Sequence, residues 1–348
     1  MQRVLPEWRE AVMGRCGRIA GLLCLAMALV AAGPATGAAR TVPVRVDHHV
    51  HVHSPAILGF LPDYCTRVRR FGKCDPAFTA PLSPEDLLAA MDRAGIRRAL
   101  VMSTGYLAES SMMTPPRPDG ATLLRAANDW TVELARRHPK RFSAFVAVDP
   151  TTPTALPEIA RWRGNRAVTG LKLHLTSAGV DLRRDADVAA LAATFRAAAG
   201  AKLAIMIHLR TRVGDYGARD VQRFLTDVLP AAGSSPVQVA HVGGWGGIDK
   251  ATLSALGAFA DAIEAEPKRF RNVWFDLAGV CKDDTPLRDR EALAVLIRRI
   301  GPRHFLPASD WPFTGDLADY YDRVSPLLPL TEAEWKVIRS NAAPYAKP

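Results

Sequence analysis

The chain has 348 residues, of which 48% are hydrophobic and 23% are charged. Such a composition is typical of globular proteins and excludes a disordered chain, a collagen-like repeat and a membrane protein with many spans. The formal net charge is +10, and subtracting the four arginines and two glutamates of residues 1–38 leaves +8 for the rest. This charge favours small anionic ligands in a general way. The sequence contains no basic run interleaved with aromatic residues, so it gives no indication of nucleic-acid binding.

Residues 1–39 have the pattern of a secretory signal peptide. A basic segment begins at Met13, a candidate true start of translation, and precedes an apolar run from Ile19 to Ala32 and a stretch of small residues. The apolar run has about 14 residues, fewer than the roughly 20 that a membrane-spanning helix needs. We therefore expect cleavage after Ala38 or Ala39, export to a bacterial periplasm or the medium, and no stable membrane span. An uncleaved membrane anchor is the alternative.

Export would place the cysteines in an oxidising compartment, where disulfides form. Five cysteines in a chain of this length cannot be the framework of a disulfide-built mini-domain. Cys65 and Cys74 lie close together in the sequence and are a candidate pair, although closeness in sequence does not guarantee disulfide geometry. Cys281 would then remain unpaired.

Short β-branched runs alternate with longer amphipathic segments after Arg40. We expect strands at 44–51, 98–103, 142–148, 168–174, 203–208, 237–241, 273–276 and 305–309. We expect helices at 84–94, 121–138, 188–199, 218–229, 250–265, 291–300 and 331–343, with a weaker pattern at 154–162. Strands that alternate with helices pair in parallel, and eight such units predict a single-domain α/β fold, a (β/α)₈ TIM barrel over residues 40–348. An open doubly wound sheet is the alternative.

The helix after residue 83 carries the clearest terminal signals. Ser83 is a favoured N-cap, Pro84 suits the first helical position, and Gly95 is a typical stop. Residues 54–81, which precede this helix, form an insertion after the first strand. In a barrel this insertion would lie on the active-site face.

Seven of the nine histidines fall at the expected carboxyl ends of strands. These seven are His48, His49, His51, His53, His174, His208 and His241. Asp310 directly follows the eighth strand. Because side chains alternate along a strand, His49 and His51 point to one side and His48 to the other. Catalytic residues of barrels come from the carboxyl ends of several strands, and imidazoles with one carboxylate suit Zn²⁺ or a similar transition metal.

These ordered motifs resemble the amidohydrolase superfamily, in particular its amidohydrolase-related branch, over essentially the whole chain after the signal. The family's first-strand pattern Asp-x-His-x-His matches Asp47, His49 and His51, and His53 lies outside it. The later motifs place His174 on the fourth strand, His208 on the fifth, His241 on the sixth and Asp310 on the eighth. The resemblance implies a divalent metal, usually zinc, and hydrolysis or, in one branch, non-oxidative decarboxylation.

One metal ion, most simply Zn²⁺, is expected at these strand ends. The expected metal ligands are His49, His51, His208 and Asp310. A metal with an open coordination position lowers the pKa of bound water toward about 7 and polarises a substrate carbonyl. Asp310 can ligate the metal and also accept the proton of the water. His241 either ligates or acts as acid, base or oxyanion partner, and in mononuclear relatives the sixth-strand histidine takes the second role, which we favour.

Lys172 and His174 share one face of the expected fourth strand, so both can reach the site. In binuclear relatives a lysine on this strand is carboxylated and bridges two metals, which makes both residues candidates for a second metal or for the substrate. We favour the simpler interpretation, in which Lys172 pairs with an acid or with a substrate carboxylate.

Arg210 and Arg212 follow His208 on a loop that would face the barrel mouth. Arginine suits bidentate capture of a carboxylate, although the two are equally well explained as solvated surface charges. Trp245 and Trp311 either line the pocket or pack in the core. Loops set specificity in such barrels, so the sequence leaves the substrate and the oligomeric state open.

The leading prediction is an exported, metal-dependent hydrolase that acts on an amide, cyclic amide or lactone of a small, anionic substrate. A metal-dependent decarboxylase (carboxy-lyase) on the same scaffold is the nearest alternative. A metal-holding binding protein without turnover is a third hypothesis. Asp310 together with His241 speaks against the third, because binding alone needs no proton-transfer group.

Overall fold

The computed structural model describes residues 42–69 and 72–346, in which eight strands form one parallel sheet. The strands are β1 Val46–His51, β2 Arg98–Met102, β3 Phe142–Ala147, β4 Val168–His174, β5 Ala204–His208, β6 Val237–Val239, β7 Val273–Asp276 and β8 Phe305–Leu306. They pair in chain order from β1 to β8. The predicted signal peptide of residues 1–39 lies outside the described residues. Within those residues, no helix has the length and apolar character that crossing a membrane requires.

Backbone hydrogen bonds between β1 and the segment after β8 close the barrel. His48 N donates to Pro307 O over 3.1 Å, and His51 N donates to Trp311 O over 2.8 Å. An isolated parallel bridge also joins Val50 to Trp311. The predicted (β/α)₈ barrel is therefore confirmed, because an open doubly wound sheet would leave its two outer strands apart.

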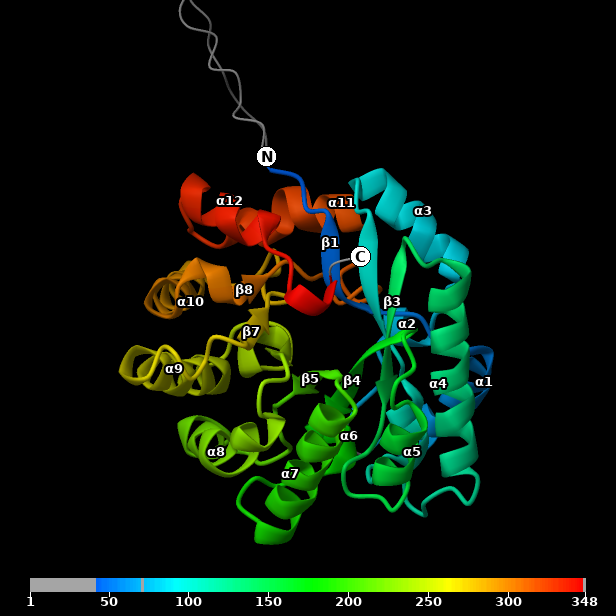
Figure 1. Cartoon of the computed structure of the whole chain (residues 1–348). Coiled ribbons are helices and arrows are strands. Elements are labelled where there is room, and N and C mark those ends of the chain that lie inside the picture. Colours follow the sequence, from blue (N-terminus) through cyan, green and yellow to red (C-terminus); the bar gives the residue numbers. More distant parts are fainter. Residues whose placement is uncertain (1–41, 70–71, 347–348) are drawn as a thin grey trace, which may run out of the picture. The chain divides into compact units, whose positions relative to one another are not determined.

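Helices surround the barrel, as Figure 1 shows. They are α1 Pro55–Arg67, α2 Pro76–Thr79, α3 Pro84–Ala94, α4 Gly120–Arg137, α5 Ala155–Arg161, α6 Leu175–Ala178, α7 Asp185–Gly200, α8 Ala218–Arg223, α9 Lys250–Ala265, α10 Leu287–Ile300, α11 Leu317–Asp319 and α12 Glu332–Ser340. The signals predicted for α3 are present: Ser83 and Asp86 form a capping box, and Gly95 ends the helix with a φ of 69°. The helix predicted at 218–229 is interrupted, because α8 gives way to a π-helical turn at Phe224–Val228.

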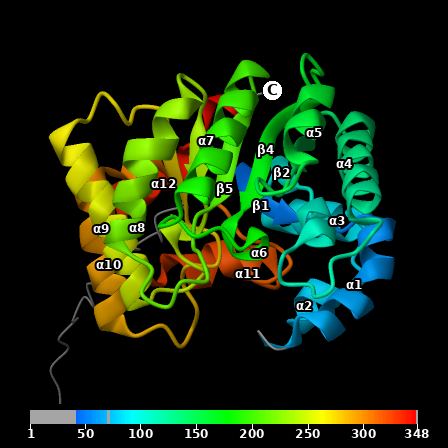
Figure 2. The same ribbon diagram turned by 90° about the horizontal axis from the view of Figure 1, so that it is seen from below.

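The predicted insertion after β1 is largely helical and consists of α1 and α2. The side chain of Ser54 caps α1 by accepting a hydrogen bond from Ile57 N. Cys65 and Cys74 are joined by a disulfide, with Cα atoms 5.8 Å apart, which ties the end of α1 to the residues just before α2. In Figure 2, α1 and α2 lie toward the same end of the barrel as α6, which directly follows β4. The insertion therefore lies at the carboxyl end of the strands.

Two strands end two or more residues earlier than the sequence predicts. β6 stops at Val239 instead of residue 241, and β8 stops at Leu306 instead of residue 309. A residue in the left-handed conformation follows each strand: His241 has a φ of 52° and lies within the span predicted for β6, and Asp310 has a φ of 66°. Such left-handed conformations are rare outside glycine and often mark functional sites.

Candidate active site

A cavity of about 340 Å³ opens at the carboxyl ends of the strands. Most of the site residues predicted from the sequence line this cavity, namely His49, His51, Lys172, His174, His208, His241, Trp245 and Asp310. This is the position that the barrel fold predicts for a functional site. The cavity is also lined by residues of the insertion, among them Tyr64, Asp75 and Phe78.

Three atoms from β1 and from the segment after β8 converge at the cavity. His49 Nε2 lies 3.1 Å from His51 Nε2, and Asp310 Oδ1 lies 3.5 Å from the first nitrogen and 3.3 Å from the second. Two atoms that bind one metal ion at about 2.1 Å, with an angle of about 90° to 109° between them, lie about 3.0–3.4 Å apart. The three atoms thus have the chemistry and nearly the spacing of a metal-binding group.

The charges of this group also fit a metal. Burial lowers the pKa of His49 to about 3 and lowers the pKa of His51, so both imidazoles are neutral at pH 7. Burial raises the pKa of Asp310, but the nearby imidazoles of His241 and His49 more than offset this effect and hold it at about 2. Neutral imidazole and ionised carboxylate are the forms that bind metal.

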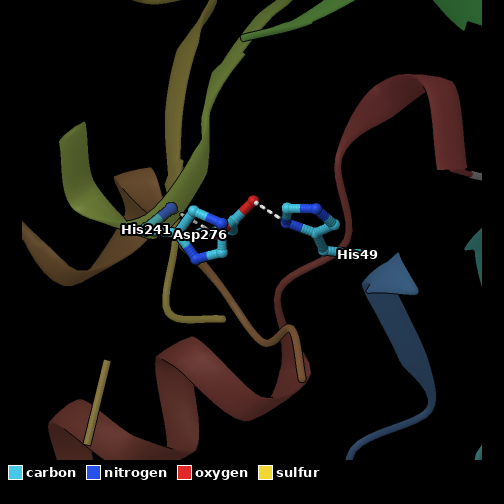
Figure 3. Close-up of side chains that lie close together, drawn as sticks. All are labelled: His49, His241 and Asp276. Carbon is cyan, nitrogen blue, oxygen red and sulfur yellow. Dashed lines mark hydrogen bonds and ion pairs between the residues drawn. The ribbon is translucent and has the colours of Figure 1, made fainter. Parts of the chain in front are cut away.

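Asp276 at the end of β7 belongs to a second convergent group, with His49 and His241. Its carboxylate is already saturated with hydrogen bonds: Oδ2 accepts from Gln238 Nε2 at 2.6 Å and lies 3.2 Å from His49 Nδ1, and Oδ1 accepts from His241 N at 2.8 Å. Figure 3 shows Asp276 beside His49 with this contact dashed. A carboxylate in this place fixes a proton on Nδ1 and leaves Nε2 free to ligate. Asp276 is therefore better suited to orient His49 than to bind metal.

His241 follows β6 and has one ring nitrogen committed to the protein. Nδ1 lies 2.7 Å from the carbonyl oxygen of Ala278, to which it can only donate a proton. Its ring centroid is 5.0 Å from that of His49. Nε2 is thus the nitrogen left for proton transfer at the cavity, which fits the acid–base role predicted for His241.

Lys172 on β4 points into the same group. Its Nζ lies 2.9 Å from His49 Nε2 and 3.4 Å from the sulfur of Met206. Burial lowers the pKa of Lys172 to about 8. The sequence predicts an acid or a substrate carboxylate as the partner of Lys172, whereas its hydrogen-bond partners in the structure are an imidazole and a thioether.

Two predicted residues, His174 and His208, form a stacked pair in the cavity wall. Their register on β4 and β5 places them side by side. Nδ1 of His174 accepts a hydrogen bond from Ser177 N at 3.2 Å, whereas Nδ1 of His208 is buried without a partner among the described residues. His208 belongs to neither convergent group in the described part of the chain.

Three predicted substrate contacts are not part of the cavity lining. Arg210 pairs with Asp249 at 3.2 Å and lies over the ring of Tyr216. Arg212 donates to Ser111 Oγ at 2.6 Å. Trp311 is 5% exposed and takes part in closing the barrel. None of the three lines the cavity, because the loops after β5 and β8 turn these side chains elsewhere.

Several residues of the site are not among those predicted from the sequence. Asp276 carried a signal that could have been used, since an acidic residue ends the seventh expected strand. Lys282 and Thr314, in the segments after β7 and β8, and the aromatic residues Phe78 and Phe313 also line the cavity. Their loops carry no periodic pattern, so nothing in the sequence indicates where these side chains point.

Comparisons with solved structures give the same fold. A 5-carboxyvanillate decarboxylase from Sphingomonas paucimobilis is 18% identical with a TM-score of 0.58, and the match covers 86% of this chain and 97% of that one. An amidohydrolase from Burkholderia multivorans with bound zinc is 16% identical with a TM-score of 0.54, covering 85% and 96%. A 5-carboxyvanillate decarboxylase from Novosphingobium aromaticivorans, complexed with manganese and a nitrobenzoic acid, is 17% identical with a TM-score of 0.56, covering 86% and 94%.

At these identities the likeness shows the fold alone. No curated protein sequence is significantly similar to the chain. The sequence model of one family, described as amidohydrolase, matches residues 46–343, a span that begins with β1 and includes every histidine and aspartate of the cavity described above. On the strength of this match over most of its length, the protein belongs to the amidohydrolase family.

Proposed function

We propose that the protein is a metal-dependent hydrolase that cleaves an amide, cyclic amide or lactone of a small anionic substrate. The observation that carries the proposal is the convergence of His49 Nε2, His51 Nε2 and Asp310 Oδ1 at the cavity. These three atoms would hold one divalent metal, and imidazole nitrogens with one carboxylate suit Zn²⁺ or a similar transition metal. A metal held there supplies Lewis acidity, which polarises a carbonyl group and lowers the pKa of water.

The chain's own groups would move the protons. Asp310 is ionised at neutral pH, so its carboxylate can accept a proton from the attacking water. His241 keeps Nδ1 bonded to Ala278 O, which leaves Nε2 to take up a proton or to donate one to the leaving group. The two groups come from different strands, so one can act as base while the other acts as acid.

Lys282 is the residue that we propose for binding a substrate carboxylate, in place of Arg210 and Arg212. Lys282 lines the cavity, is exposed to solvent, and makes no ion pair with any described residue. Thr314 lines the same cavity, and its hydroxyl oxygen is buried without a partner among the described residues. An unpaired cation in the cavity wall favours an anionic ligand.

The first test is the metal content of the purified protein by elemental mass spectrometry. We expect about one transition metal per chain, and loss of the metal in a His49→Ala/His51→Ala variant. His53→Gln is the matched control. His53 lies on the same segment, but its ring nitrogens bond to Thr104 Oγ1 and Phe78 O and not to the proposed metal ligands. Protein that binds no metal after zinc addition would overturn the proposal.

The second test is a substrate panel of lactones, cyclic amides and amides in H₂¹⁸O. Incorporation of one ¹⁸O into the product, lost in Asp310→Asn, supports hydrolysis. Within the panel, Lys282→Gln should raise KM for substrates with a carboxylate and leave KM for their neutral amide analogues unchanged. Arg210→Gln, which removes a paired cation outside the cavity, is the control and should change neither.

A carboxy-lyase is the second candidate, because two of the similar solved structures reported above are decarboxylases. Such an enzyme would use the same metal-binding group and release carbon dioxide without taking up oxygen from water. Aromatic carboxylates in the same panel, assayed for carbon dioxide, distinguish the two reactions. Carbon dioxide release without ¹⁸O in the organic product would favour the carboxy-lyase.

We also propose that the protein is exported. The support is the signal-like pattern of residues 1–39 and the Cys65–Cys74 disulfide, a bond typical of oxidising compartments. Amino-terminal sequencing of the protein purified from its native host should begin at residue 39 or 40. A protein that keeps its first residues would contradict cleavage.

A further inference from the structure

We propose that Tyr345 is a positioning residue for His49 and acts through Gln238 and Asp276. Tyr345 lies in the 3₁₀ turn Pro344–Ala346, near the end of the described chain. It does not line the cavity. The inference rests on the metal site proposed above, to which His49 contributes.

A continuous chain of hydrogen bonds links the two residues. The hydroxyl group of Tyr345 donates to Gln238 Oε1 at 2.6 Å. Gln238 Nε2 donates to Asp276 Oδ2 at 2.6 Å. The same carboxylate oxygen lies 3.2 Å from His49 Nδ1, which donates to it. Tyr345 is thus connected to a proposed metal ligand through two intermediate side chains.

The amide of Gln238 gives this chain a fixed direction. Gln238 is fully buried, and its Nε2 also donates to His48 O at 3.2 Å, so both amide protons have acceptors. If the amide turned over, its oxygen would face the Asp276 carboxylate, and its NH₂ group would face the Tyr345 hydroxyl group. Asp276 and His48 O, which can only accept, therefore set the orientation of the amide, and the Tyr345 hydroxyl group completes it by donating to Oε1.

The segment that carries Tyr345 is anchored to the strand that carries His49. Ala343 N donates to Nε2 of His48 at 3.2 Å, and the opposite ring nitrogen of His48 lies 2.9 Å from Pro307 O. The ring of Tyr345 packs edge-on against Phe145, with centroids 5.9 Å apart. These contacts hold the hydroxyl group in place, so it can act as a fixed donor.

The expected consequence concerns the direction of the His49 ring. Asp276 keeps the proton on Nδ1 and leaves the Nε2 lone pair directed toward His51 and Asp310. Without the Tyr345 hydroxyl group, the buried Oε1 of Gln238 loses its donor, and the amide is held less firmly. Asp276 would then be held less firmly, and metal would bind less tightly although no ligand has changed.

The experiment measures the affinity of the full-length protein for Zn²⁺ and Co²⁺ by competition with a chromophoric chelator. We expect Asp276→Asn to weaken binding about 10- to 100-fold and Tyr345→Phe to weaken it about three- to tenfold. The absorption bands of bound Co²⁺ should shift in both variants, because the ligand geometry changes. Tyr216→Phe is the matched control. It removes a buried tyrosine hydroxyl group that donates to Gly243 O and takes no part in the hydrogen bonds from Tyr345 to His49.

A double-mutant cycle tests the route. Tyr345→Phe should cause no further loss of affinity in the Asp276→Asn background, because the chain is already cut. If Tyr345→Phe fails to fold, Gln238→Met interrupts the same chain and should show the same coupling. Wild-type affinity and an unchanged Co²⁺ spectrum in Tyr345→Phe would overturn the proposal, as would an equal loss in Tyr216→Phe. If His49→Ala/His51→Ala binds metal normally, the metal site itself is wrong, which is a different result.

Discussion

The imidazole rings of His174 and His208 lie parallel to one another, with centroids 4.0 Å apart and planes 6° apart. Parallel pairing of β4 with β5 sets this contact, since the two histidines are register partners at the strand ends. Burial lowers the pKa of both imidazoles well below the usual value, so the stack consists of two neutral rings. One wall of the cavity is therefore a preorganised aromatic surface that also carries ring nitrogen atoms.

This stack leads to a prediction about His208, the expected metal ligand that lies outside the group of His49, His51 and Asp310. Nδ1 of His174 accepts from the backbone, whereas Nδ1 of His208 has no partner in the described residues. We expect His208→Ala to lower the affinity for Zn²⁺ and His174→Ala to leave it nearly unchanged, as measured by chelator competition. Equal, wild-type affinities would assign His208 to the cavity wall and leave His49, His51 and Asp310 as the ligands.

Asp310→Asn should abolish most turnover. The substitution keeps the shape of the side chain but removes the negative charge that accepts a proton, so kcat should fall about 10²- to 10⁴-fold. The melting temperature and circular dichroism spectrum should stay close to wild type. Near wild-type kcat in this variant would show that Asp310 is not the base.

Lys172→Met distinguishes one metal from two. Its ammonium group lies 2.9 Å from the proposed ligand atom His49 Nε2, where it competes with a metal for the same lone pair. We expect the variant to keep one metal per chain and to bind it at least as tightly as wild type. Two metals in the wild-type protein and fewer in the variant would instead indicate a carboxylated Lys172 that bridges them.

Asp149→Asn should stabilise the protein at neutral pH. Burial raises the pKa of Asp149 from 3.8 to about 6, and its Oδ2 is buried without a partner in the described residues. The folded chain therefore binds the proton more tightly than the unfolded chain, so the free energy of unfolding falls as the pH rises from about 4 to about 6. Removing this charge should raise stability by about 1–3 kcal/mol at pH 8, with no gain at pH 4.

Urea unfolding at the two pH values checks this prediction. The asparagine keeps the Oδ1 that accepts from Thr151 N and Thr151 Oγ1. Asp181→Asn is the control. Asp181 Oδ1 also accepts a hydrogen bond from a backbone N–H two residues later, that of Arg183, but Asp181 is less buried than Asp149. A gain of the same size at pH 4 would show that charge burial is not the cause.

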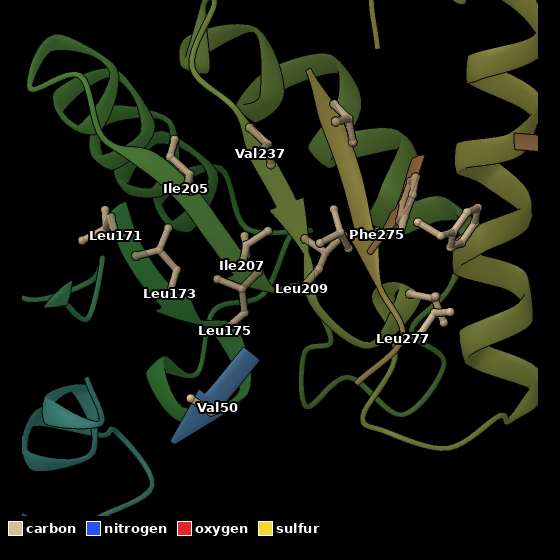
Figure 4. Close-up of a cluster of buried hydrophobic side chains, with 14 of the residues drawn as sticks. Val50, Leu171, Leu173, Leu175, Ile205, Ile207, Leu209, Val237, Phe275 and Leu277 are labelled. Carbon is tan, nitrogen blue, oxygen red and sulfur yellow. The ribbon is translucent and has the colours of Figure 1, made fainter. Parts of the chain in front are cut away.

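The barrel and the positions of the histidine and aspartate motifs within it follow from local patterns in the sequence. Apolar residues alternate with others along the strands, so Leu171 and Leu173 pack in the outer core, as Figure 4 shows, while Lys172 between them faces the cavity. The same two-residue period places His49 and His51 on one side of β1. Parallel strands bring their carboxyl ends to one rim, so the order of the histidines alone was enough to predict one site.

Only the tertiary structure decided which side chains meet. Arg210 and Lys282 both follow strands on loops, yet Arg210 pairs with Asp249 and Lys282 lines the cavity. Loop backbones have no fixed period, so the direction of a side chain depends on what packs around it. The contact between Tyr345 and Gln238 joins residues 107 positions apart. No local pattern encodes such a pairing, because it exists only once the barrel has closed around the last described turn of the chain.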